Sequence, residues 1–217
     1  MNKEEFILEL KKININITTK QLEQLDKYYN LLLEWNKKIN LTRIIEEEDV
    51  YLKHFYDSLT LSMIVDLNKE LTLCDIGTGA GFPGIVLKIV FPTLSITLID
   101  SLLKRINFLN LVISELKLEK IVAIHCRAED YAKINKNKFD IVTSRAVSKL
   151  SNLLPYSIPL LKKDGYFIPM KANCEDEIKE SNPVLKRLKV EVKDILEFKL
   201  PIENSNRTLI KIGKKLL

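Results

Sequence analysis

A run of glycines between residues 75 and 84 is the part of this sequence best suited to binding a ligand. It reads Asp75-Ile-Gly77-Thr-Gly79-Ala-Gly81-Phe-Pro-Gly84 and follows a short apolar run. Glycine allows the backbone to turn tightly and to approach a ligand with no Cβ atom in the way. In open α/β sheets, ligands bind at the carboxyl ends of the strands. We therefore expect this turn to hold a nucleotide-like ligand.

Two ligands fit such a turn. Gly79, Gly81 and Gly84 satisfy the G-x-G-x-x-G pattern of dinucleotide binding, which indicates NAD. The alternative pattern is acidic–apolar–G-x-G-x-G, in which the turn approaches the amino-acid part of S-adenosylmethionine. Asp75 before the first glycine favours the second pattern, as does Pro83, which is unusual in a dinucleotide turn.

Two further segments fit the same ligand. Asp100 lies at the end of the next predicted strand, where a carboxylate can accept hydrogen bonds from both ribose hydroxyls. Residues 125–130 follow the third predicted strand, and in this topology their loop passes the adenine ring. A backbone N–H and a side-chain carboxylate there could read the edge of that ring.

Alternating strands and helices must position these segments. Apolar runs predict strands over 71–76, 95–99, 121–125, 139–143, 165–171, 190–199 and 206–212. Helical patterns are predicted over 82–91, 102–115, 149–161 and 174–188. This alternation predicts a Rossmann-like α/β fold, a mostly parallel seven-stranded sheet with helices on both faces. The last two strands are expected to form an antiparallel hairpin at its edge.

Residues 1–70 have a different character, because every periodic segment in them is helical. Helices are predicted over 3–12, over 19–38 with Thr18 or Thr19 as the cap, and once or twice within 47–65. We therefore expect two parts: a helical N-terminal extension over 1–70, packed on the core, and a Rossmann-like domain over 71–217.

Composition narrows the classes of protein. Hydrophobic residues make up 46% of the 217 residues, enough for a sizeable core. No apolar run approaches the roughly 18 residues of a membrane span, and no signal peptide is visible, so we expect a cytoplasmic protein with no membrane partner. The three cysteines have no metal-ligand spacing, so we expect no metal site.

Charge is unevenly distributed along the chain. Residues 1–70 hold 10 basic and 13 acidic side chains, whereas residues 71–217 hold 24 basic and 16 acidic ones. A basic second part suits a polyanionic substrate such as nucleic acid, although lysine-rich composition alone would produce the same excess.

Short motifs are spread along the chain: Tyr29-Asn-Leu-Leu-Leu-Glu-Trp-Asn36, Asn40-Leu-Thr42, His54-Phe-Tyr-Asp-Ser-Leu59, Phe82-Pro-Gly84, Arg105-Ile-Asn-Phe-Leu109, Arg127-Ala-Glu129 and Ser144-Arg-Ala146. In these motifs the sequence resembles the RsmG (GidB) family of small-subunit ribosomal RNA guanine-N7 methyltransferases. The resemblance covers nearly the whole chain.

The resemblance implies a class I methyltransferase fold and S-adenosylmethionine as the cofactor. It implies methyl transfer to N7 of guanine 527 in 16S rRNA, with the small ribosomal subunit as partner, and we expect a monomer. Together with the turn and strand-end arguments, the predicted cofactor-binding residues are Gly77, Gly79, Phe82, Asp100, Ala128, Glu129 and Arg145. One departure is that Lys171 precedes Ala172, where relatives usually have Lys-Gly, which leaves the role of Lys171 open, like those of His54 and Asp57.

The reaction type can be weighed from the residues after the fourth predicted strand. No cysteine nucleophile for a pyrimidine carbon stands there. Residues 152–156 only loosely match the motif used for exocyclic amines, and they lie inside a predicted helix. A ring nitrogen needs no general base, so no catalytic residue is assigned, and Arg145 is the candidate for shaping the site.

Other functions stay open at this stage. One is a small-molecule or protein methyltransferase on the same fold, and another is a module that senses S-adenosylmethionine without catalysis. A NAD-dependent oxidoreductase is disfavoured because no separate substrate domain or hydride-transfer acid is visible.

Overall fold

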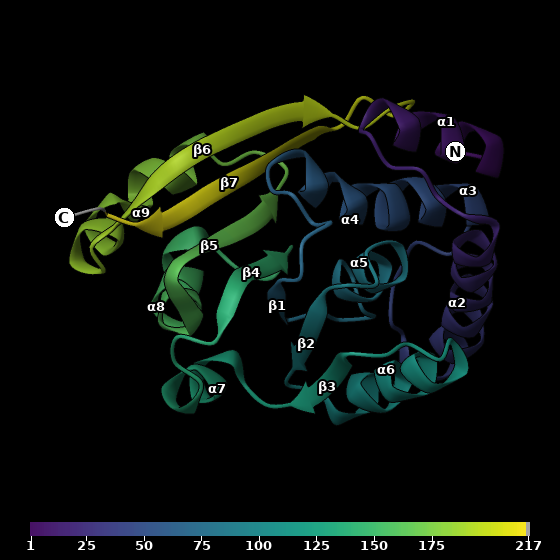
Figure 1. Ribbon diagram of the computed structural model, residues 1–217, viewed down its shortest axis with the longest axis horizontal. Helices are drawn as coiled ribbons and strands as arrows, with labels where there is room; N and C mark the ends of the chain where they lie inside the picture. Colours follow the sequence, from purple (N-terminus) through teal and green to yellow (C-terminus); the bar gives the residue numbers. More distant parts are fainter. Residues whose placement is uncertain (216–217) are drawn as a thin grey trace.

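Seven strands form one sheet in the order β3-β2-β1-β4-β5-β7-β6 in the computed structural model, which describes residues 1–215 (Figure 1). Strands β1 to β5 pair in parallel, and β7 runs antiparallel to both β5 and β6. The predicted mostly parallel sheet and its edge hairpin are therefore confirmed. The strands are β1 Thr72–Ile76, β2 Ser95–Asp100, β3 Ile121–His125, β4 Phe139–Arg145, β5 Leu161–Lys171, β6 Val190–Lys199 and β7 Asn206–Lys214.

Helices cover both faces of this sheet, as the alternation predicted. One face carries α5 (Gly84–Val90) and α6 (Leu103–Glu115). The other carries α7 (Ala128–Ile134), α8 (Leu150–Leu160) and α9 (Glu175–Arg187). Because β1 to β4 run parallel, their carboxyl ends lie together at one end of the strands, where the glycine turn also lies.

Helix α7 was not predicted. Its seven residues bury only Tyr131 and Ala132, so the segment carries no helical stripe of apolar side chains. Packing against α8 supplies the stability that the local pattern does not indicate.

The N-terminal region is helical, as predicted. It contains α1 (Lys3–Lys12), α2 (Thr19–Ile39), α3 (Glu47–Val50), a π-helix (Tyr51–Tyr56), α4 (Asp57–Leu59) and a 3-10 turn (Thr60–Met63). Thr18 is the N-cap of α2, with a reciprocal capping box to Gln21. A π-helix is rare and frequently marks a functional site.

An aromatic cluster joins the N-terminal helices to the layer of α5 and α6. The fully buried Tyr28 ring of α2 stacks on Phe55 at 5.7 Å and on Phe108 of α6 at 6.5 Å between ring centroids. The same ring lies 5.5 Å from Phe82 in the glycine turn, and its hydroxyl donates to the carbonyl of Ala80. The N-terminal helices therefore share one core with the sheet and contact the glycine turn directly.

Within residues 1–215, no helix is long and apolar enough to cross a membrane. Cys74 and Cys174 are buried, and Cys126 is partly exposed.

Candidate active site

A cavity of about 620 Å³ opens at the carboxyl ends of the first four strands. Its size is in the range of ordinary small-molecule sites, which is roughly 300–1,000 Å³. Leu41, Thr42 and His54 of the N-terminal region form part of its wall. All seven residues predicted to bind the cofactor line this one cavity: Gly77, Gly79, Phe82, Asp100, Ala128, Glu129 and Arg145.

The glycine turn presents an open backbone to this cavity. Gly79 has a φ of +62°, which side-chain-bearing residues rarely adopt, and a Cβ atom there would meet nothing within 4 Å. Its N–H donates to Oδ2 of Asp100 over 3.0 Å. The turn is therefore held from one side by the second strand and leaves its other side free for a ligand.

Asp75 holds the glycine turn in shape through hydrogen bonds to two of its residues. Its Oδ2 accepts hydrogen bonds from the Thr78 hydroxyl at 2.7 Å and from the Gly84 N–H at 2.9 Å. The side chain is fully buried, and this burial raises the pKa of Asp75 to about 6. The acidic residue that distinguished the two ligand patterns thus shapes the turn and does not line the cavity.

Asp100 can accept fewer hydrogen bonds from a ligand than the sequence suggested. Its Oδ2 accepts from Gly79 and from Arg105 at 3.1 Å, and its Oδ1 accepts from the N–H of Leu102 at 2.9 Å. Since each carboxylate oxygen offers about two acceptor sites, residues 1–215 leave one site unused, on Oδ1. The carboxylate can therefore receive one further donor, where we had expected it to serve two ribose hydroxyls.

Ala128 and Glu129 form the first turn of α7. The first backbone N–H groups of a helix have no partner within the helix, so these residues can donate to a ring edge. The Glu129 side chain is exposed at the cavity.

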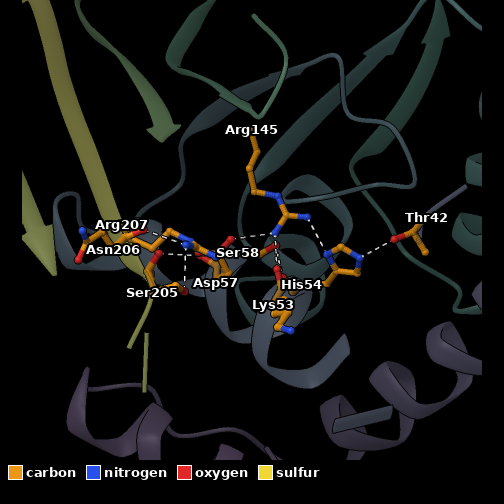
Figure 2. A network of polar contacts seen from close by, with 10 residues as sticks. Thr42, Lys53, His54, Asp57, Ser58, Arg145, Ser205, Asn206 and Arg207 are labelled. Atoms are coloured by element: carbon orange, nitrogen blue, oxygen red, sulfur yellow. Dashed lines mark hydrogen bonds and ion pairs between the residues drawn. The ribbon is translucent and has the colours of Figure 1, made fainter. Parts of the chain in front are cut away.

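Arg145, at the end of β4, is held by the N-terminal region (Figure 2). Its Nη1 donates to the carbonyl of Lys53 at 2.9 Å and to Oδ2 of Asp57 at 3.1 Å, and its Nη2 donates to Nδ1 of His54 at 3.0 Å. The guanidinium also lies 5.2 Å from the centroid of the Phe82 ring. Three of its five N–H groups are thus occupied, and among residues 1–215 the other two have no partner and can bind a ligand.

Asp57 and His54 complete this network, and sequence reasoning had left their roles open. Asp57 is buried, and its Oδ1 accepts from Nε of Arg207 at 2.9 Å, so one carboxylate bridges two arginines (Figure 2). His54 stacks on Phe82 at 4.3 Å between centroids, and its Nε2 lies 2.9 Å from Oγ1 of Thr42. Burial, followed by the positive charge of Arg145, lowers the pKa of His54 to about 3, so the ring is neutral.

Lys171 lies behind the cavity wall. Its ammonium donates to the carbonyl of Ser148 and pairs with Glu177 at 2.9 Å. Glu177 in turn accepts from the N–H of Leu150 at 2.9 Å. Lys171 and Glu177 together hold the loop after β4 in place. Val147 of this loop packs against the glycine turn. Lys171 is therefore placed to support the wall without lining the cavity.

Thr42 is one of several cavity residues to which sequence reasoning gave no role of their own. The only signal for it was its place in the Asn40-Leu-Thr42 motif. A short polar residue between helices has no pattern that indicates which distant strand ends it faces.

Known proteins resemble this chain over almost its whole length. Residues 21–208 match the family GidB, rRNA small subunit methyltransferase G. The ribosomal RNA small subunit methyltransferase G of Oceanobacillus iheyensis is 48% identical, covering 99% of this chain and 92% of the relative. The Bacillus subtilis protein of the same name is 46% identical, covering 99% and 91%.

Solved structures support the fold. A SAM-dependent methyltransferase from Aquifex aeolicus superposes with a TM-score of 0.58 at 17% identity, over 77% of this chain and 93% of that one. A ribosomal protein L11 methylase from Lactobacillus delbrueckii gives 0.57 at 17% identity, over 76% and 79%. At such identities the likeness concerns the fold alone. The curated relatives, by contrast, share nearly half of their residues with this chain over almost its whole length. The chain therefore belongs to the rRNA small subunit methyltransferase G family.

Proposed function

We propose that this protein transfers the methyl group of S-adenosylmethionine to N7 of guanine 527 in 16S rRNA. The main observation behind the proposal is that all seven predicted cofactor residues line one and the same cavity, at the carboxyl ends of the strands. The family match supports the reaction, because it spans residues 21–208 and so includes both the glycine turn and the N-terminal wall.

The residues present fit S-adenosylmethionine. The open side of Gly79 offers space for the amino-acid part, the free lone pair of Asp100 can accept one ribose hydroxyl, and Ala128 with Glu129 can read the adenine edge. When bound, the cofactor supplies a methyl group on a positively charged sulfur. We assign the cofactor carboxylate to the two remaining N–H groups of Arg145, since a fixed guanidinium binds carboxylates well.

The reaction requires positioning and no proton transfer. Guanine N7 has an in-plane lone pair and no proton, so the N–C bond forms as the S–C bond breaks, and the sulfur keeps the electron pair. Two of the three candidate bases are already engaged: His54 has partners on both nitrogens, and Asp57 accepts from two arginines. Orientation of the reacting atoms can accelerate such a step by up to roughly 7–11 kcal/mol.

The test is mass spectrometry of 16S rRNA from cells with and without this gene. We expect 7-methylguanine in the 16S rRNA only when the gene is present, and purified protein should restore it in vitro. Purified protein that methylates only a small molecule or a protein would support the corresponding alternative. Binding of the cofactor without any product would support the sensing module.

A mechanism without a titrating base predicts a flat pH profile. Single-turnover rates at saturating cofactor and RNA should change little between about pH 6.5 and 9. A log-linear rise with pH that disappears on replacing His54, Asp57 or Glu129 would contradict this mechanism.

We further propose that the protein acts as a monomer in the cytoplasm, where small-subunit rRNA is found. Residues 1–70 and 71–217 act as one folded unit in this proposal. It is supported by the shared core and by the N-terminal residues in the cavity wall.

A further inference from the structure

A chain of hydrogen bonds runs from the strand end through the N-terminal wall to Thr42 (Figure 2). Arg145 contacts His54, and His54 contacts Thr42, with distances of 3.0 and 2.9 Å. Both Thr42 and His54 line the cavity. The direction in which each bond is donated can be deduced from the chemistry of the groups.

The first bond determines the tautomer of His54. A guanidinium has N–H donors and no acceptor, so Nδ1 of His54 must accept from Arg145 and carries no hydrogen. A neutral imidazole has one N–H, which therefore lies on Nε2. This N–H faces Oγ1 of Thr42, and the threonine oxygen accepts it.

The threonine hydroxyl is left with a hydrogen to donate. Its oxygen accepts a second bond from the backbone N–H of Ile44 at 3.1 Å. A hydroxyl has two acceptor lone pairs and one hydrogen, so both lone pairs are used. Among residues 1–215 its oxygen makes no other hydrogen bond, so the hydrogen remains for a ligand in the cavity.

The position of Thr42 points to the second substrate. The residues assigned to the cofactor come from the turn and strand ends after β1, β2 and β3, and from Arg145. Thr42 comes from the N-terminal region, next to Leu41 and His54, and not from the glycine turn or a strand end. None of the parts of the cofactor assigned above is assigned to this hydroxyl, which leaves it for the group that receives the methyl.

We propose that the Thr42 hydroxyl donates a hydrogen bond to O6 of the target guanine and so selects guanine over adenine. This inference rests on the proposed function. O6 lies beside N7 on the same edge of the base, so this bond orients the ring and leaves the N7 lone pair free. Adenine presents an amino donor at that place, and two donors would then face each other without an acceptor.

The experiment combines two enzyme variants with two bases. Thr42→Val removes the hydroxyl at nearly constant shape, and Thr42→Ser keeps it as the matched control. The substrate is small-subunit RNA assembled by ligation, carrying either guanine or 2-aminopurine at the target position. 2-Aminopurine has hydrogen in place of O6 and retains N7. The readouts are the single-turnover rate of methyl incorporation and the affinity for S-adenosylmethionine by calorimetry.

We expect Thr42→Val to slow methylation of the guanine substrate about 10- to 100-fold, the loss expected for an unpaired polar group. Thr42→Ser should stay near wild type, and cofactor affinity should be unchanged. Thr42→Val also leaves the N–H groups of His54 and Ile44 without their acceptor, and a loss from this cause is common to both bases. The loss on 2-aminopurine should therefore be at least about 10-fold smaller than the loss on guanine. The ratio between the two bases is taken within each variant, so a partly unfolded preparation does not alter it.

Three results would overturn the assignment. Equal rates of wild type and Thr42→Val on guanine would show that the hydroxyl contacts no acceptor. A parallel loss of cofactor affinity would assign the hydroxyl to the cofactor. An equal loss on both bases would show a structural role. Failure of the proposed function is distinguishable, because wild type would then form no 7-methylguanine on any RNA.

Discussion

Asp57 is a buried negative charge between two positive ones, and its neutralisation is the sharpest test of the network in Figure 2. Only 4% of the residue is exposed, and its two oxygens lie 3.1 Å from Arg145 and 2.9 Å from Arg207. Asp57→Asn keeps the size of the side chain and removes the charge. The two guanidinium groups then face each other across a neutral amide, and one of them meets an N–H donor in place of an acceptor.

The expected loss of stability in Asp57→Asn follows from the burial of the two ion pairs. Breaking a buried ion pair by removing one partner costs about 3–5 kcal/mol. The side chains of Arg145 and Arg207 keep 13% and 21% exposure, so water recovers part of this loss. We therefore expect Asp57→Asn to lower the free energy of unfolding by about 2–3 kcal/mol. For a chain of this size that corresponds to a fall in melting temperature of roughly 5–10 °C.

The assay is urea and thermal unfolding of the full chain at neutral pH. The matched control is Asp49→Asn, the same change in an exposed pair with Lys53 at 3.1 Å, which should alter stability by less than about 0.5 kcal/mol. Equal, small effects of the two substitutions would refute the reasoning, because the network would then add no more than a surface ion pair.

Further predictions concern pH, the cofactor and the N-terminal helices. The pKa of His54 is about 3 in the folded protein and 6.5 for the free side chain. Its contribution to the free energy of unfolding is therefore complete above pH 6.5 and declines as the pH falls toward 3. The stability of wild type relative to His54→Gln should therefore drop by about 1–2 kcal/mol from pH 7 to pH 5 in urea titrations, and a constant difference would contradict the neutral buried ring. Asp100→Ala should weaken S-adenosylmethionine binding by about 1.5–3 kcal/mol in calorimetry, with the exposed Asp130→Ala as a control that retains wild-type affinity. Deleting residues 1–45 should yield insoluble or inactive protein, because it removes Tyr28 and its buried neighbours; a truncated chain with full stability and activity would disprove the shared core.

Local signals were sufficient for most of the elements. The strands from β1 to β4 are mainly apolar runs ended by glycine or polar residues, as is β5 after its charged first part, residues 162–164. Helices such as α2 begin at a cap that can be recognised in the sequence. Helix α7 was missed because it is short and largely polar, so its formation depends on α8 and not on its own pattern.

By itself the sequence predicted at which ends of the strands the cavity opens and which residues gather there. Gly77, Gly79 and Asp100 follow predicted strands, and parallel strands bring their carboxyl ends together whatever the rest of the chain does. The family resemblance added Phe82, which lies within the turn, and Arg145 by motif, and both line the cavity.

Only the tertiary structure decided what surrounds Arg145. Asp57 is 88 residues from Arg145 and 150 residues from Arg207 along the chain, so no local periodicity relates them. Their meeting depends on how the N-terminal helices pack on the sheet, which is determined by burial of side chains from the whole chain. The free hydrogen of Thr42 depends on the same packing, because donor and acceptor roles become fixed only when every partner of a buried polar group is in place.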